Sequence, residues 1–79
     1  MFVYILYSQT LQKYYTGQTQ NLKDRLARHK NGLVKSTKNG KPWVLVHFIV
    51  CDSRSEAMML EKRIKKRGAK RYLKDINIL

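Results

Sequence analysis

Residues Phe2–Thr19 read FVYILYSQTLQKYYTGQT, two segments of apolar and aromatic residues joined by a polar stretch. The segments Phe2–Tyr7 and Lys13–Thr19 are rich in β-branched and aromatic side chains, which favour strands. The intervening Ser8–Gln12 predicts a turn. This part of the sequence therefore predicts a β-hairpin against which the rest of the chain must pack.

Two further elements are predicted directly after the hairpin. Asn21 is a suitable N-cap for a helix that runs to about Lys30, and Gly32 lies where helices commonly end. A basic loop follows over Leu33–Pro42. Trp43–Cys51 (WVLVHFIVC) is almost continuously apolar and predicts a buried strand.

The last third of the chain predicts two helices. Ser53 can cap a helix through about Arg67, because Glu56 three residues later completes a capping box. Gly68 breaks that helix, and Ala69–Asp75 predicts a short final one. The order β-β-α-β-α-α indicates an α+β fold, a small three-stranded antiparallel sheet flanked by helices.

Length and charge limit the possible functions. With 79 residues, the chain predicts one domain, residues 1–79, with a thin core. Seventeen Lys and Arg against five Asp and Glu give a net charge of +12, which favours a polyanionic partner, above all nucleic acid. No long amphipathic basic helix supports binding to an anionic membrane.

Cysteine and apolar content indicate a soluble, cytoplasmic protein without zinc. The single Cys51 cannot form an internal disulfide, which fits a reducing compartment. Cys51 and His47 lack further ligands at zinc-binding spacing. The apolar run Phe2–Tyr7 is too short to cross a membrane.

The positive charge is concentrated in two segments. Lys23–Lys41 holds seven cations and Glu61–Lys74 holds eight. They can be solvated surface residues, or together a surface that contacts phosphates. The candidate nucleic-acid contacts are Lys13, Lys35, Lys38, Lys41, Lys65 and Lys66.

Polar residues interrupt the apolar face of the first helix. Leu22, Leu26 and Leu33 define that face, and Arg25 and His29 lie on it one turn apart. The planar guanidinium of a half-buried arginine suits a phosphate or a carboxylate. Alternatively, Arg25 extends to solvent and His29 makes one hydrogen bond in the core.

The second long helix contains a similar exception. Ala57, Leu60 and Ile64 form an apolar stripe with Glu61 at its edge. Glu61 has no capping role such as that of Glu56, and its simplest explanation is an ion pair with Lys65 one turn later.

Tyrosines and a glycine occupy strand positions. Tyr4 shares a sheet face with Phe2 and Leu6, and Tyr15 shares one with Gly17. Tyrosine is an ordinary core residue in strands, but glycine inside a strand often marks the close approach of another group.

Together these residues resemble the GIY-YIG nuclease superfamily. Phe2-Val3-Tyr4 is similar to its first motif and Tyr15-Thr16-Gly17 to its second. Thr19–His29 resembles the helix with the family's arginine and histidine, and Ser55–Lys65 resembles the helix with its metal-binding glutamate. Phe2 stands in place of the first motif's glycine. The resemblance covers nearly the whole chain and is strongest to small stand-alone bacterial members.

The resemblance implies an endonuclease that hydrolyses DNA with Mg²⁺ or Mn²⁺, with a role in DNA repair or recombination. It implies that Glu61 holds the metal, that Arg25 binds the phosphate, and that Tyr4 is the general base or positions the water. Tyr15 and His29 would orient the water or relay the proton. A phenol needs nearby cations to lower its pKa for this role.

The implied site residues, Tyr4, Tyr15, Arg25, His29 and Glu61, are expected to line one concave surface on the sheet. Which of Tyr4 and His29 accepts the proton stays open. The alternative function is a catalytically inactive basic module that binds DNA or RNA, and a basic scaffold protein is a third.

Overall fold

A computed structural model describes the whole chain, residues 1–79, and confirms the predicted order of elements. The strands are β1 (Phe2–Ser8), β2 (Lys13–Thr19) and β3 (Trp43–Val50), and the helices are α1 (Leu22–Lys30), α2 (Arg54–Arg67) and α3 (Ala69–Asp75). A short 3₁₀ turn, Lys38–Gly40, lies inside the predicted loop. The sheet is antiparallel throughout.

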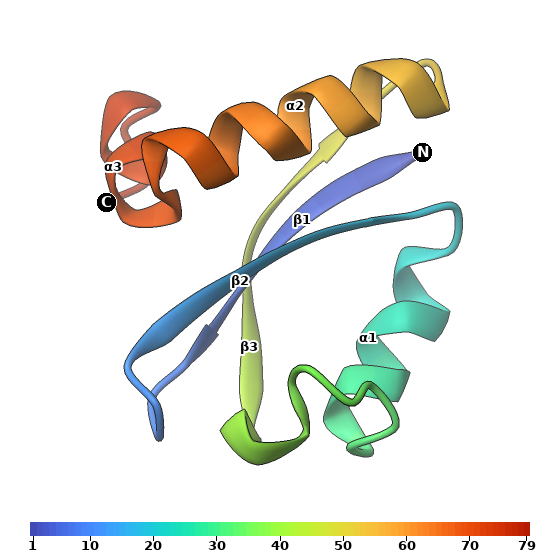
Figure 1. Cartoon of the computed structure of the whole chain (residues 1–79), viewed down its shortest axis with the longest axis vertical. Coiled ribbons are helices and arrows are strands. Elements are labelled where there is room, and N and C mark those ends of the chain that lie inside the picture. Colours follow the sequence, from blue (N-terminus) through green and yellow to red (C-terminus); the bar gives the residue numbers. More distant parts are fainter.

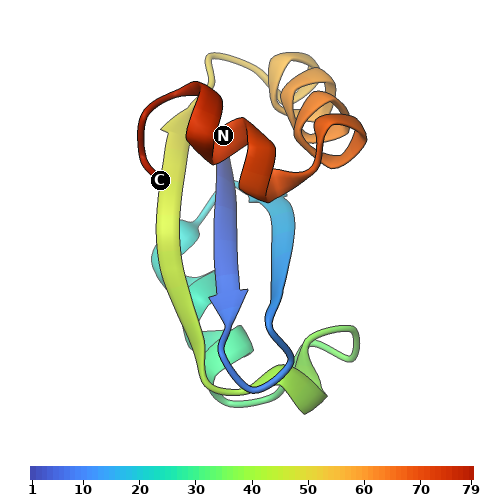
Figure 2. The ribbon, with the colours of Figure 1, turned by 90° about the vertical axis from the view of Figure 1, so that its left-hand side faces the viewer.

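The sheet has the order β2-β1-β3, so the first strand is central. Figures 1 and 2 show α1 on one face of the sheet and α2 and α3 on the other. Side chains alternate between these faces along β1. Val3 and Ile5 face α2 and α3, whereas Tyr4 and Leu6 face α1.

The hydrophobic core lies between the sheet and the last two helices. Val3 and Ile5 pack with Ala57 and Ile64 of α2 and Leu73 of α3, and each of the five side chains is fully buried. The predicted α2 stripe is therefore confirmed, with Leu60 half-buried at its edge.

The helix caps follow the sequence signals. The Asn21 side chain accepts a hydrogen bond from the Asp24 N–H at 3.0 Å, and Ser53 Oγ accepts one from the Glu56 N–H at 3.1 Å. The Glu56 carboxylate accepts from the N–H of Asp52 rather than from that of Ser53. Gly68, with φ of +91°, ends α2.

Two expectations were wrong. The apolar run of β3 was expected to be buried, but it forms a sheet edge, and Val44, Phe48 and Val50 are exposed. An edge strand has a neighbouring strand on one side only, so these side chains are less covered than those of the central strand β1. Leu33 does not extend the apolar face of α1, because the helix ends at Lys30 and Leu33 is 73% exposed.

The thin core makes stability sensitive to single core residues. We expect Ile64→Ala to lower the free energy of unfolding by about 2–5 kcal/mol and Ile64→Val by about 0.5–1.5 kcal/mol. Met59→Ala, at a position 68% exposed on the same helix, is the control and should change it by less than about 0.5 kcal/mol. Urea denaturation measures all three. Equal losses for Ile64→Ala and Met59→Ala would contradict this description of the core.

Candidate active site

Tyr4 lies at the centre of the sheet, directly across from Gly17 of β2. A Cβ atom added to Gly17 would lie 2.5 Å from the Tyr4 hydroxyl oxygen and 2.7 Å from the adjacent ring carbon. Only glycine therefore allows the phenol to rest on the β2 backbone. The glycine inside the predicted strand does mark a close approach, and the approaching group is Tyr4.

A chain of hydrogen bonds fixes the Tyr4 hydroxyl. It lies 2.9 Å from Nε2 of His29, and Nδ1 of the same ring lies 2.7 Å from Oγ1 of Thr37. Thr37 Oγ1 donates its own proton to the Val34 carbonyl, so it accepts from Nδ1–H. Nε2 is then free to accept the Tyr4 proton. Tyr4, His29 and Thr37 are all at most 1% exposed.

Aromatic rings surround this chain. The Tyr15 ring centroid lies 6.3 Å from that of Tyr4 and 5.2 Å from that of His29. Trp43 lies 6.2 Å beyond Tyr15, and its indole N–H donates to the Thr37 carbonyl at 2.7 Å. The indole thus holds Thr37 in place beneath His29.

Arg25 lies one turn before His29 on α1 and is half-buried. Its guanidinium forms no ion pair within the chain, where the three ion pairs join other residues. Its positive charge acts to lower the pKa of both Tyr4 and His29. A half-buried, unpaired guanidinium beside a polar cluster is suited to receive an anion.

Glu61 reaches the cluster from a different direction. It belongs to α2, which covers the opposite face of the sheet and packs along the edge strand β2. The negative charge of Glu61 contributes to raising the pKa of Tyr4. Tyr4, Tyr15, Arg25 and His29 thus lie on the α1 side of the sheet, and Glu61 comes from the α2 side. That all five line one concave surface stays a prediction.

The Glu61 side chain is 18% exposed and forms the ion pair with Lys65 that the sequence allowed, at 2.7 Å. Lys65 itself is 56% exposed and can move into solvent. No group of three or more His, Cys, Asp or Glu side chains could hold a metal ion. Binding of a metal at this site would therefore depend on one carboxylate.

Burial governs the proton affinities in the cluster. It raises the pKa of the Tyr4 phenol, with the neighbouring Tyr15 adding to the effect, and Arg25 only partly opposes it. Burial and the Arg25 charge both lower the pKa of His29. Arg25 does lower the pKa of Tyr4, as expected of a nearby cation, but desolvation of the buried phenol raises it by more. At neutral pH the pair is a neutral phenol that donates to a neutral imidazole.

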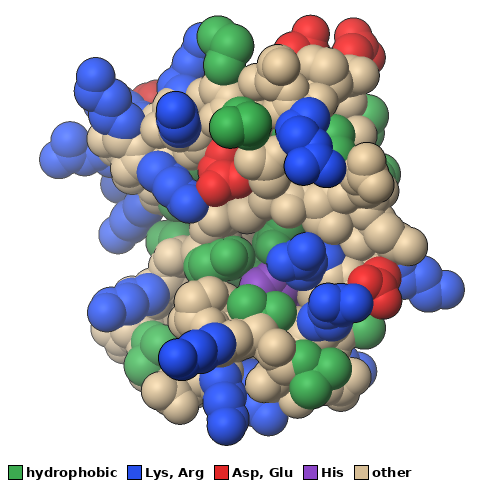
Figure 3. All heavy atoms as spheres, turned by 45° about the vertical axis from the view of Figure 1, so that its right-hand side comes forward, with side chains coloured by type: hydrophobic (Ala, Val, Ile, Leu, Met, Phe, Trp, Pro, Cys, Tyr) green, Lys and Arg blue, Asp and Glu red, His purple; other side chains and the backbone are tan.

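The predicted phosphate-binding lysines are all exposed: Lys13, Lys35, Lys38, Lys41, Lys65 and Lys66. Figure 3 shows Lys and Arg side chains around a hollow between two lobes, with a histidine visible inside it. The arrangement suits a long anionic ligand that crosses the hollow.

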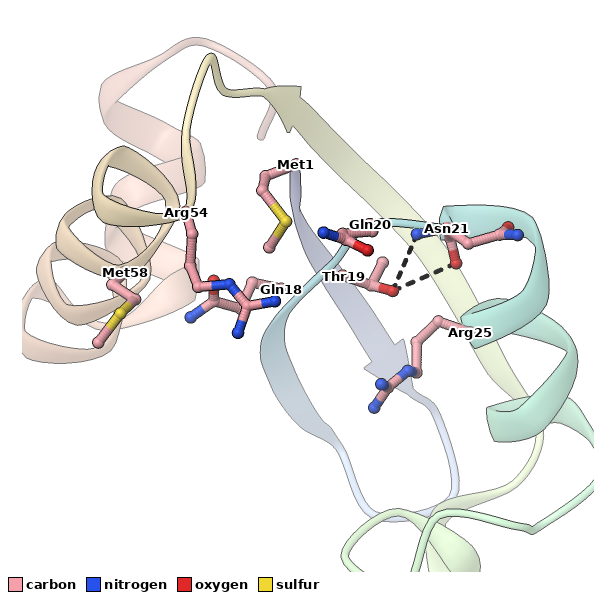
Figure 4. Close-up of a pocket in the computed structure, with 8 residues that line it drawn as sticks. All are labelled: Met1, Gln18, Thr19, Gln20, Asn21, Arg25, Arg54 and Met58. Carbon is pink, nitrogen blue, oxygen red and sulfur yellow. Dashed lines mark hydrogen bonds between the residues drawn. The ribbon is translucent and has the colours of Figure 1, made fainter.

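Sequence reasoning missed several residues near the site. Thr37 lies in the loop and had no periodic pattern to reveal it. Gln18 and Arg54 line a pocket beside Arg25 (Figure 4). Arg54 carried a usable signal, because a cation at the first position of a helix opposes the helix dipole.

Comparison with known proteins agrees with this arrangement. The family model described as the GIY-YIG catalytic domain matches residues 1–74. A UPF0213 protein of Staphylococcus haemolyticus is 43% identical over 63 residues, which cover 78% of this chain and 77% of that protein. A UPF0213 protein of Syntrophus aciditrophicus is 40% identical, over 82% of this chain and 76% of the relative. These names specify no reaction. No solved structure matches the chain with significance.

The lowered pKa of His29 predicts how stability depends on pH. Because the unfolded histidine has a pKa of about 6.5 and the folded one a lower value, the unfolded state binds the extra proton first. Stability is therefore full above about pH 6.5 and falls below it, by at most about 1.4 kcal/mol per pH unit for this group. Urea denaturation between about pH 5 and 7 measures the slope.

His29→Asn should flatten this slope. The same replacement at His47, which lies on β3 outside the cluster, is the matched control and should keep it. If the free energy of unfolding of His29→Asn keeps the same slope against pH, the pH dependence comes from another group.

Proposed function

Since this chain belongs to the GIY-YIG family of catalytic domains, we propose that it is a metal-dependent endonuclease that hydrolyses phosphodiester bonds in DNA. The observation that carries the proposal is the meeting of Tyr4, His29 and Arg25 on one side of β2 with Glu61 across its edge. Nucleases of this family act on nucleic acid, and the net charge of +12 fits such a substrate.

Arg25 would bind the phosphate that is attacked. Its guanidinium is unpaired in the protein and can donate two parallel hydrogen bonds to phosphate oxygens. It would hold the phosphate before the reaction and offset the negative charge that develops on it.

Tyr4 and His29 would act together on the attacking water. The raised pKa of Tyr4 excludes a free phenolate as the resting base at neutral pH. A proton taken from water by the Tyr4 oxygen can pass on only if the phenol's own proton moves to Nε2 of His29, 2.9 Å away. His29 is thus the final acceptor, Tyr4 the relay, and half-buried Tyr15 positions the water.

The residues present fit a hard divalent cation such as Mg²⁺ or Mn²⁺. Such an ion keeps several waters and needs only one or two protein carboxylates when substrate phosphate supplies further oxygens. Glu61, partly exposed and paired only with an exposed lysine, would hold it. When bound, the ion supplies neutralisation of charge on the phosphate and the leaving oxygen.

Recognition would depend mostly on the DNA backbone. The exposed lysines contact phosphates that are the same in every sequence, so we propose weak or structure-directed specificity. A cytoplasmic location belongs to the same proposal and is supported by the unpaired Cys51.

A catalytically inactive binding module for DNA or RNA is the second candidate. The net charge of +12 and the Glu61–Lys65 ion pair favour it, because a carboxylate neutralised by lysine needs no metal. It would bind with strong salt dependence and without any requirement for divalent cations.

Two substitutions separate the enzyme from the binder. Glu61→Ala should abolish cleavage of branched, nicked or plain DNA with Mg²⁺ or Mn²⁺ and leave affinity in EDTA equal or slightly higher, because the carboxylate repels phosphate when no metal is bound. Arg25→Ala should reduce both affinity and cleavage. Gel-based cleavage and fluorescence anisotropy measure the two quantities.

Asp24→Asn, which makes the same charge change at an exposed ion pair, is the control and should still cleave. If a folded Glu61→Ala protein cleaves at the native rate, the metal ligand must be a residue other than Glu61. No cleavage of any substrate by the native protein would favour the binding module.

The slope of the binding constant against salt concentration gives the number of phosphate contacts. With about five contacts, the logarithm of the binding constant should fall against the logarithm of salt concentration with a slope of roughly −4 to −5 on duplex DNA. Replacing Lys35 and Lys38 together by Gln should reduce that slope by about 2. A binding constant that stays flat with salt would show that these lysines are only solvated.

A further inference from the structure

A polar pocket of about 410 Å³ lies beside Arg25, between the first turns of α1 and α2 and the end of β2. Figure 4 shows the Arg25 and Arg54 side chains extending from their two helices toward β2. Gln18, Gln20 and Met58 also line the pocket, and no acidic residue does. Its volume falls within the range of about 300–1,000 Å³ typical of small-molecule sites.

Some of the polar groups around the pocket are already used by the fold. Thr19 Oγ1 accepts from the Asn21 N–H and donates to the Asn21 carbonyl, and the Asn21 side chain caps α1. Gln18 is different. Its Oε1 is the one buried side-chain oxygen or nitrogen without a hydrogen-bond partner in the chain. A buried carboxamide oxygen without a hydrogen-bond partner is unfavourable for folding, and a ligand that donates a hydrogen bond to it would explain why it is there.

Arg54 is unfavourable for stability in the same way. It is the first residue of α2, where the helix dipole repels a cation, and it has no ion-pair partner. Arg25, on the other side of the pocket, is unpaired too. Two unpaired guanidinium groups in a pocket without carboxylates suit a phosphate.

The pocket also has two apolar side chains, Met1 and Met58. Thioether side chains pack favourably on flat rings, and a glutamine carboxamide can pair with the edge of a base such as adenine. A site for a bare anion would need neither feature. We propose that this pocket binds the nucleotide next to the scissile phosphate, with its phosphate at Arg54 and Arg25, its base edge at Gln18 and its ring on Met58.

The position of the pocket fits this assignment, which rests on the proposed nuclease function. Arg54, Met58 and Glu61 follow one another at helical spacings of four and three, so they share one face of α2. Arg25 belongs both to the pocket and to the candidate active site. A strand held at Arg25 would therefore have the pocket on one side and Glu61 farther along the same helix.

The test uses a ligand and conditions that do not require cleavage. The ¹⁵N-labelled full chain is titrated in EDTA with 5′-dAMP, with deoxyadenosine and with inorganic phosphate, while NMR follows the side-chain amide of Gln18 and the Nε–H of Arg54. Both signals should shift and saturate with 5′-dAMP, with an affinity at least about tenfold above that for phosphate.

Three variants assign the contacts. Gln18→Leu should weaken 5′-dAMP binding by about fivefold or more, the lower end for one base contact, and leave phosphate binding unchanged. Arg54→Gln should weaken both ligands, and Arg54→Lys should restore part of the phosphate binding. Lys23→Gln removes one charge near the same end of α1 but outside the pocket and should change neither by more than twofold. Circular dichroism checks that each variant is folded.

Equal affinity for 5′-dAMP and phosphate would show that the pocket binds only an anion and would overturn the proposal. NMR shifts confined to the exposed lysines would overturn it too. The outcome is independent of catalysis. A native protein that cleaves DNA but fails this titration contradicts the nucleotide pocket alone, and one that passes it but never cleaves contradicts the nuclease function alone.

Discussion

The contact on which the site depends is the Tyr4 phenol lying across Gly17 with its hydroxyl bonded to His29. A buried hydroxyl and a buried imidazole are each unfavourable without partners. The two can form a hydrogen bond to each other only if α1 places His29 over Tyr4 of the central strand. The other ring nitrogen of His29 needs a partner as well, which Thr37 supplies. One polar chain thus fixes the positions of the sheet, the first helix and the loop after it, in a domain whose apolar core lies on the opposite face.

The edge strand β2 is where the two sides of the molecule meet. Its Tyr15 and Gly17 belong to the α1 side, and Gln18 points to the α2 side beside Arg54. Side chains of α1 and α2 flank this strand together, since Arg25 and Arg54 line one pocket with Gln18. The two groups of the proposed mechanism that are far apart in sequence, Arg25 and Glu61, become neighbours of the same strand by this route.

Most of the fold could be predicted because local signals agreed with one another. The hairpin, the Asn21 and Ser53 caps and the break at Gly68 predicted the elements to within one or two residues. The exposure of β3 could not be predicted, since an apolar run does not say whether its strand lies at the centre or at the edge of the sheet. The site residues followed from breaks in the apolar pattern and from the resemblance, whereas Thr37 and the pocket depend on loop and edge geometry that no periodicity encodes. The raised pKa of Tyr4 also required the structure, because sequence shows nearby cations but not desolvation.

The ion pair between Glu61 and Lys65 means that the protein carries its own cation at the carboxylate proposed to hold a metal. A divalent ion would have to displace that ammonium group, so Lys65 would compete with the proposed metal for Glu61. DNA phosphates attract the same lysine and would draw it away from Glu61. Each ligand thereby removes an obstacle to the other, and linkage requires the effect to be mutual. Metal and DNA would bind with positive cooperativity, so the site would be loaded mainly when substrate is present.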